Sequence, residues 1–142
     1  MADGLQHAGD FTVDELSLIT TSGLRVNLIP NVVKLTIFED INQSCISGTI
    51  TIQDSINLSS HGPIIGQEFL SMKVRTSSVQ DDDGIIDFTE NVFIVNSLES
   101  RIEVGNSVTA YLLNFTSSEI VRNARTKVSR SLKGSYSEIV KV

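Results

Sequence analysis

The sequence predicts a mainly β protein, an antiparallel β-sandwich or barrel with one or two α-helices near the C-terminus. Apolar and polar residues alternate with a period of two in seven or eight short segments between residues 11 and 115. Turn-forming residues separate these segments at the spacing typical of antiparallel sandwiches and barrels. Beyond residue 115 the apolar period changes from that of a strand to that of a helix.

The first half of the chain carries the clearest strand signals. Residues 1–10 are small and polar, and we expect them to form a flexible N-terminal arm. Four alternating segments follow, separated by turns rich in Gly, Pro, Asn or Asp: 11–18, 24–28, 33–38 and 44–53. In the last segment the isoleucines and Gly48 share one face, and Gly48 predicts either a bulge or the close approach of another backbone.

The second half of the β region begins after an interruption. Residues 54–66 contain the Ser, His, Gly and Pro that are typical of a loop. Strand patterns then resume, with a polar loop at 77–84 and a turn at 104–107, over the segments 70–74, 85–88, 92–98 and 108–115.

A helix is predicted at 117–133. Thr116-Ser117-Ser118-Glu119 matches a capping box, in which the Thr hydroxyl and the Glu carboxylate satisfy backbone N–H groups. One face of this helix is apolar, and Gly134 can end it; the apolar residues are Ile120, Val121, Ala124, Val128 and Leu132. A second helix is expected to start at 136–142. Because an isolated helical turn needs a packed partner, we expect residues 11–142 to be one domain, and either this domain is the front part of a larger architecture or its last element docks on a neighbour.

Charge is distributed unevenly along the 142 residues, whose net charge is −6. Residues 1–118 carry five basic and fifteen acidic side chains, whereas residues 119–142 carry six basic and two acidic ones. The basic stripe has three interpretations: a solvated helix face, a contact with an acidic surface of another subunit, or a contact with nucleic acid, which the acidic body disfavours. The candidate interface residues are Arg122, Arg125, Arg130 and Lys133.

No catalytic or cofactor site is predicted. His7 and His61 have no partner ligands at metal-binding spacing, and Cys45 has no neighbouring base to activate it. No nucleophile elbow or phosphate-binding loop is present. Asp81, Asp83 and Glu90 fit three positions of a calcium loop, but Val79 occupies the first position and strands flank the loop, so a solvated turn is the favoured interpretation. We therefore expect a protein that is not an enzyme.

Two stretches of the chain resemble a known family. Val33 to Val74 contains a strand, a strand led by Ser-Gly that ends in Asp, a loop, and a strand led by Gly-Gln-Glu. Asn114 to Val140 contains a strand followed by a capped helix and then Lys-Gly-x-x-Ser-x-Ile-Val. Together they resemble the N-terminal, tail-tube-like domain of the baseplate central hub of contractile-tailed, T-even-like phages.

The resemblance implies a structural role in the virion, at the phage tail baseplate, after assembly in the host cytoplasm. In that family the hub is a trimer whose β-barrel tube domains form a pseudo-six-fold ring between tail tube and spike, around the DNA channel. The implied partners are the tail tube protein, the spike protein, baseplate wedge proteins and further copies of the chain, with no membrane partner and no specific DNA binding. The alternative from the residues is a ligand-binding β-sandwich that takes carbohydrate or calcium.

Overall fold

The computed structural model describes residues 11–55, 57–58, 64–76, 84–105, 108–127, 129, 131 and 133–139. In this part of the chain eight strands form one antiparallel sheet, which confirms the mainly β prediction. The strands are β1 (Thr12–Ile19), β2 (Arg25–Asn27), β3 (Val32–Phe38), β4 (Ser47–Asp54), β5 (Phe69–Arg75), β6 (Ile85–Asp87), β7 (Phe93–Glu103) and β8 (Thr109–Ser117). A 3₁₀ turn, η1 (Ile29–Asn31), precedes β3, and two short helices, α1 (Glu119–Arg125) and α2 (Tyr136–Ile139), follow β8. The expected arm at 1–10 lies outside the described residues.

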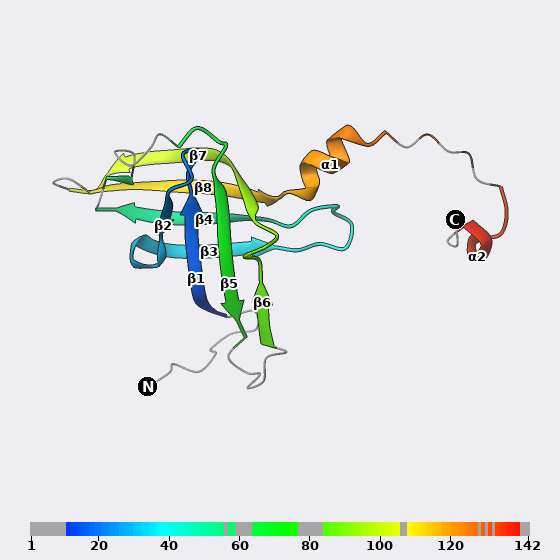
Figure 1. The fold of residues 1–142 in the computed structure, drawn as a ribbon, viewed down its shortest axis with the longest axis horizontal. Coiled ribbons are helices and arrows are strands. Elements are labelled where there is room, and N and C mark those ends of the chain that lie inside the picture. The colour runs from blue at the N-terminus through cyan, green and yellow to red at the C-terminus, as the bar shows by residue number, and fades with distance from the viewer. Residues whose placement is uncertain are drawn as a thin grey trace.

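The sheet is continuous but strongly folded. Its strand order is β2-β1-β5-β7-β8-β4-β3, and β6 pairs with β5 beside this path. Figure 1 shows β1, β5 and β6 crossing steeply over the layer formed by β3, β4, β7 and β8. Each layer therefore turns one face toward the other and one face outward.

The core lies between these two layers. Alternate residues of β4, β5 and β8 point inward and are almost fully buried, as the period of two requires. Phe93 is central, because its ring contacts Phe88 and Phe115 edge-on at centroid distances of 4.8 and 5.0 Å. The buried apolar residues include Leu16, Leu18, Leu28, Ile50, Ile52, Leu70, Met72, Phe93, Leu113 and Phe115.

A bulge explains the mixed pattern at the start of β1. Val13 pairs with Val74 and Glu15 with Lys73, so Asp14 is an extra residue in the ladder. Phe11 and Val13 pack against the core before the bulge, and Leu16 and Leu18 are buried after it. The apolar face of β1 therefore changes phase within one strand.

Gly48 marks a close approach, one of the two outcomes that the sequence predicted for it. A Cβ atom built at Gly48 would lie 2.5 Å from the Thr36 carbonyl oxygen and would overlap the ring of Phe115. Neither the neighbouring backbone of β3 nor the buried ring leaves room for a side chain there. Glycine is needed at this position so that β3, β4 and β8 can pack this closely.

Two buried carboxylates organise the loops. Glu68 is fully buried, and its side chain accepts hydrogen bonds from the backbone N–H groups of Ile65, Gly66 and Gln67 at 2.9, 2.9 and 3.1 Å. Asp54 accepts a hydrogen bond of 2.8 Å from the N–H of Leu58. Both acids satisfy backbone donors of a loop that no ladder can satisfy.

The first helix is shorter than predicted, and the predicted capping box does not form at its N-terminus. The expected helix at 117–133 extends only over Glu119–Arg125, because Thr126 adopts an extended conformation and its N–H bonds back to Arg122 and Asn123. The Thr116 hydroxyl does not cap the helix; it donates to the carbonyl of Ile46 at 3.2 Å. Tertiary pairing of β8 with the segment before β4 therefore replaces the expected capping box. No helix among the described residues has the length and apolar character needed to cross a membrane.

Candidate functional site

The calcium candidates are not brought together as a described site. Asp81 and Asp83 lie outside the described residues, and Glu90 is exposed in the bend after β6. Within the described ranges, no group of three or more His, Cys, Asp or Glu residues is placed to hold a metal ion. His7 and His61 also fall outside these ranges.

The basic stripe projects from the body of the protein. Arg122 and Arg125 lie in the last turn of α1, and these two and Lys133 are exposed, whereas Arg130 lies outside the described residues. No residue of α1 is buried, and the helix is tied to the body by a 3.0 Å hydrogen bond from Asn123 to the Ser44 hydroxyl. Figure 1 shows α2 lying apart from the sheet.

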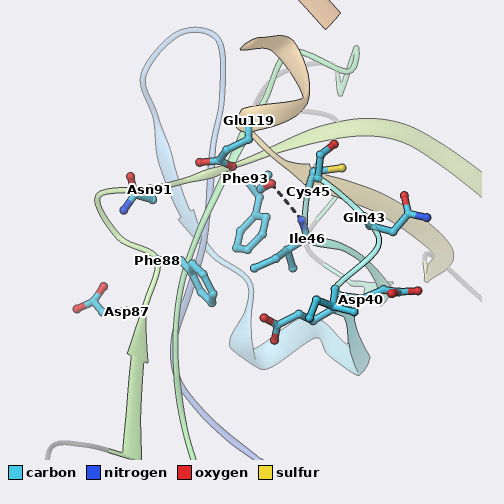
Figure 2. Close-up of a pocket in the computed structure, with 13 residues that line it drawn as sticks. Asp40, Gln43, Cys45, Ile46, Asp87, Phe88, Asn91, Phe93 and Glu119 are labelled. Atoms are coloured by element: carbon cyan, nitrogen blue, oxygen red, sulfur yellow. Dashed lines mark hydrogen bonds between the residues drawn. The ribbon is translucent and has the colours of Figure 1, made fainter. Parts of the chain in front are cut away.

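A pocket of about 830 Å³ opens beside the start of α1. Three segments far apart in the sequence line it: the β3–β4 connection, the segment from Asp87 to Phe93, and the junction of β8 with α1. Figure 2 shows Asp40 and Ile46 on one side and Phe88, Phe93 and Glu119 on the other. We name it the acidic pocket, and its residues are Glu39, Asp40, Ile41, Gln43, Ser44, Cys45, Ile46, Asp87, Phe88, Asn91, Phe93, Ser117 and Glu119.

The pocket has an apolar floor and an acidic rim. Phe88, Phe93 and Ile46 supply the floor, and four carboxylates surround it. Hydrogen bonds from the Thr89 hydroxyl and N–H lower the pKa of Asp87, and a hydrogen bond with Ser117 lowers the pKa of Glu119. Asp87 and Glu119 are therefore ionised at neutral pH, and no lining residue is basic. Such a surface suits a cationic, partly apolar group of a partner.

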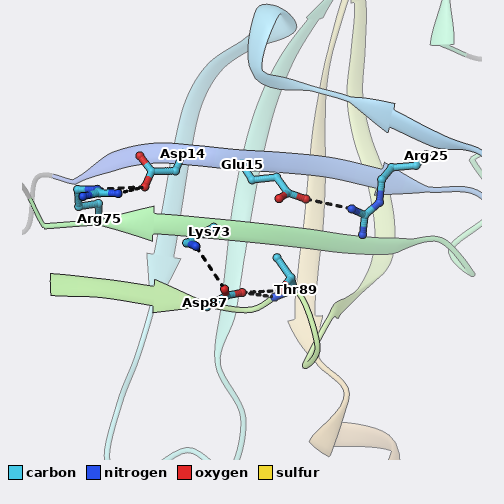
Figure 3. Close-up of polar contacts among 7 residues, drawn as sticks. All are labelled: Asp14, Glu15, Arg25, Lys73, Arg75, Asp87 and Thr89. Carbon is cyan, nitrogen blue, oxygen red and sulfur yellow. Dashed lines mark hydrogen bonds and ion pairs between the residues drawn. The ribbon is translucent and has the colours of Figure 1, made fainter. Parts of the chain in front are cut away.

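Most basic residues of the β body are already paired. On the outer face of the layer containing β1, β5 and β6, Arg25 bonds Glu15 at 3.1 Å and Arg75 bonds Asp14 at 2.9 Å (Figure 3). Lys73 lies 3.6 Å from Asp87, whose other oxygen accepts from Thr89. Exposed pairs of this kind add at most about 1 kcal/mol each. They do, however, neutralise three of the body's five cations.

The opposite outer face is polar and nearly uncharged. Across β3, β4, β8 and β7 the register aligns Thr36, Thr49, Asn114 and Ser97 in one row. Asn114 donates to Ser97 at 2.7 Å and to Glu99 at 2.8 Å, so the row is internally bonded. The next row contains Lys34, Thr51, Leu112 and Glu99. We name these two rows the polar face.

Neither surface was singled out from the sequence. The acidic pocket joins segments that are more than twenty residues apart, and no local motif marks it. In β4, Ser47, Thr49 and Thr51 lie opposite the isoleucine face, but the sequence does not show the partners that extend this polar row across the sheet.

Comparison with known proteins identifies no family. No family model matches the chain, and neither a curated protein nor a solved structure matches it. The chemistry of these surfaces is therefore the basis for assigning a role.

Proposed function

We propose that this protein is a structural component of a phage tail baseplate. It forms part of the hub ring that joins the tail tube to the central spike and surrounds the DNA channel. The observation that carries the proposal is the polar face, whose composition suits the wall of a channel for DNA. The sequence resemblance to the tube domain of phage hub proteins supports the same role.

The polar face presents few groups that could bind DNA. Affinity for DNA depends on Lys and Arg side chains that neutralise phosphates and release counterions. In the two rows that form this face, Lys34 is the one cation, and it lies on the last strand of the sheet. The Asn114–Ser97–Glu99 network also occupies polar groups that could otherwise bond phosphate. DNA could therefore pass along the polar face without binding to it.

The shape of the sheet suits a ring. In the described residues the strand path ends at β2 and β3, which therefore present edges to a neighbour. Val33 and Phe38 on β3 are 64% and 54% exposed, although both are apolar. A contact between two different surfaces of identical subunits closes into a ring when the rotation between them allows it. The partners in this proposal are further copies of the chain, the tail tube protein, the spike protein and baseplate wedge proteins, within the virion.

Adding cations to the polar face tests this role. Thr36→Lys/Thr49→Lys places two lysines in the first row, and Thr12→Lys/Ile86→Lys places two on the other layer as a matched control. We expect the first variant to assemble into tails but to deliver DNA about tenfold less efficiently, because new phosphate contacts retard the passing strand. Equal delivery by the two variants would contradict the assignment of the polar face to the channel.

A further inference from the structure

We infer that the basic arm of one copy, defined as residues 120–139, docks in the acidic pocket of a second copy of the same chain. The inference deepens the proposed function and rests on it for the identity of the partner. It assigns a receiving surface and a donated segment to the contact between neighbouring subunits.

The lining of the acidic pocket complements a segment that is basic and partly apolar, as the arm is. Its floor offers Phe88, Phe93 and Ile46, and its rim offers four carboxylates with no lining cation. One of the four, Asp87, already pairs with Lys73 at 3.6 Å. Ile41 also lines the pocket and is 99% exposed, so its side chain is accessible to a docked segment. Apolar contact with the floor and charge attraction at the rim would act together on a basic amphipathic segment.

The arm has the complementary character. Ile120 and Val121 are 39% and 40% exposed, and Arg122, Arg125 and Lys127 are exposed beside them. Residues 119–142 have a net charge of +4, whereas residues 1–118 have a net charge of −10. A short helix with no buried residue has little to stabilise it until a partner covers its apolar side.

The arrangement of the arm favours a second copy over the arm's own pocket. Glu119 lines the pocket itself, so the arm begins at the rim. The bond between Asn123 and Ser44 holds α1 against the β3–β4 connection, and α2 lies apart from the body (Figure 1). Three of the five cations of the body are no substitute, because Arg25, Lys73 and Arg75 already pair with carboxylates. If each copy gives an arm and receives one, the contact is head-to-tail and can close into a ring.

Cross-linking through Cys45 tests the contact directly, because this residue lines the pocket and is the only cysteine in the chain. A recipient chain keeps Cys45, and a tagged donor chain carries Cys45→Ser with one arm substitution: Arg125→Cys, Ser129→Cys or Lys133→Cys. A matched control donor carries Cys45→Ser with Ile102→Cys, at a site that is 60% exposed on β7. With a short bis-maleimide, we expect a donor–recipient product for at least one arm position and none for the control. No such product, or equal yields from arm and control donors, would overturn the inference. A chain with Cys45 and an arm cysteine that cross-links only within itself would also overturn it.

Charge exchange gives an independent test. We expect Arg125→Glu/Lys133→Glu to weaken self-association by about tenfold or more, and mixing this chain with a Glu39→Lys/Asp40→Lys recipient to restore it. The control Arg75→Glu/Arg101→Glu, on β5 and β7 and outside the pocket lining, changes the net charge equally and is expected to leave association unchanged. Rings that persist with the reversed arm would refute the docking contact and leave the hub role intact. A trans cross-link in a protein that is absent from tails would refute the hub role and leave the contact intact.

Discussion

Replacing Gly48 with alanine should destabilise the protein, although alanine normally improves a strand interior. The added methyl would lie 2.5 Å from the Thr36 carbonyl oxygen and would overlap the fully buried Phe115 ring, which itself contacts Phe93 at 5.0 Å. Overpacking of this kind costs about 1–3 kcal/mol. Alanine loses less backbone entropy than glycine on folding, and this difference offsets roughly 0.5–1 kcal/mol of that cost. We therefore expect the free energy of unfolding of Gly48→Ala to fall by about 1–2 kcal/mol, which corresponds to a decrease in Tm of roughly 3–7 °C.

Urea unfolding followed by circular dichroism measures this change. Ser47→Ala is the matched control, because it alters the neighbouring residue of β4 without adding volume, and we expect a change within about 0.5 kcal/mol. In a Phe115→Leu background the penalty of Gly48→Ala should be smaller, since part of the overlap is removed. An unchanged or increased stability of Gly48→Ala would refute the packing described for β3, β4 and β8.

Three further predictions follow from the buried acids, the buried tyrosine and the calcium hypothesis. Glu68→Gln should lower the free energy of unfolding by about 1–3 kcal/mol, because an amide NH₂ would replace one oxygen that accepts a backbone N–H; stability equal to the native chain would contradict that geometry. Burial and the neighbouring Asp54 raise the pKa of Tyr111, so the unfolded chain loses this proton first, and stability should fall as the pH rises above about 10. Tyr111→Phe should remove that alkaline component, and a native chain with flat stability between pH 9 and 11 would refute it. Because a solvated turn is the favoured interpretation of Asp81, Asp83 and Glu90, millimolar calcium should shift Tm by less than about 1 °C, whereas a rise of several degrees would support the ligand-binding alternative.

Much of the fold could be predicted because strand periodicity is a local property. The ends of the predicted segments 11–18, 33–38 and 70–74 each lie within one residue of the ends of the observed strand. The predicted segment 44–53 begins too early, since Ile46 bonds the hydroxyl and N–H of Ser117 in place of a ladder partner on β3. The helix was predicted too long for a similar reason. The part of its apolar stripe that lies in α1 is not buried, so packing does not stabilise the helix and propensity alone does not extend it past Arg125.

The candidate surfaces could not be predicted, because both depend on register and on contacts between distant segments. Glu39, Asp87 and Glu119 are separated by tens of residues and are joined only when β4 pairs with β8 and β7 turns back beside them. Similarly, Thr36, Thr49 and Asn114 form one row only in the observed pairing. The uneven charge of the chain was visible from the sequence, and the structure adds that α2, at the end of the basic arm, lies apart from the acidic body.

Electron cryo-microscopy of the assembled tail that contains this protein tests the proposed role most directly. The proposal predicts density for the eight-stranded sheet in a ring at the tail axis, between the tube and the spike. It also predicts that the polar face, with Thr49 and Asn114, is turned toward the channel. Density away from the axis, or a ring in which the ion-paired face of β1 and β5 lines the channel, would contradict it.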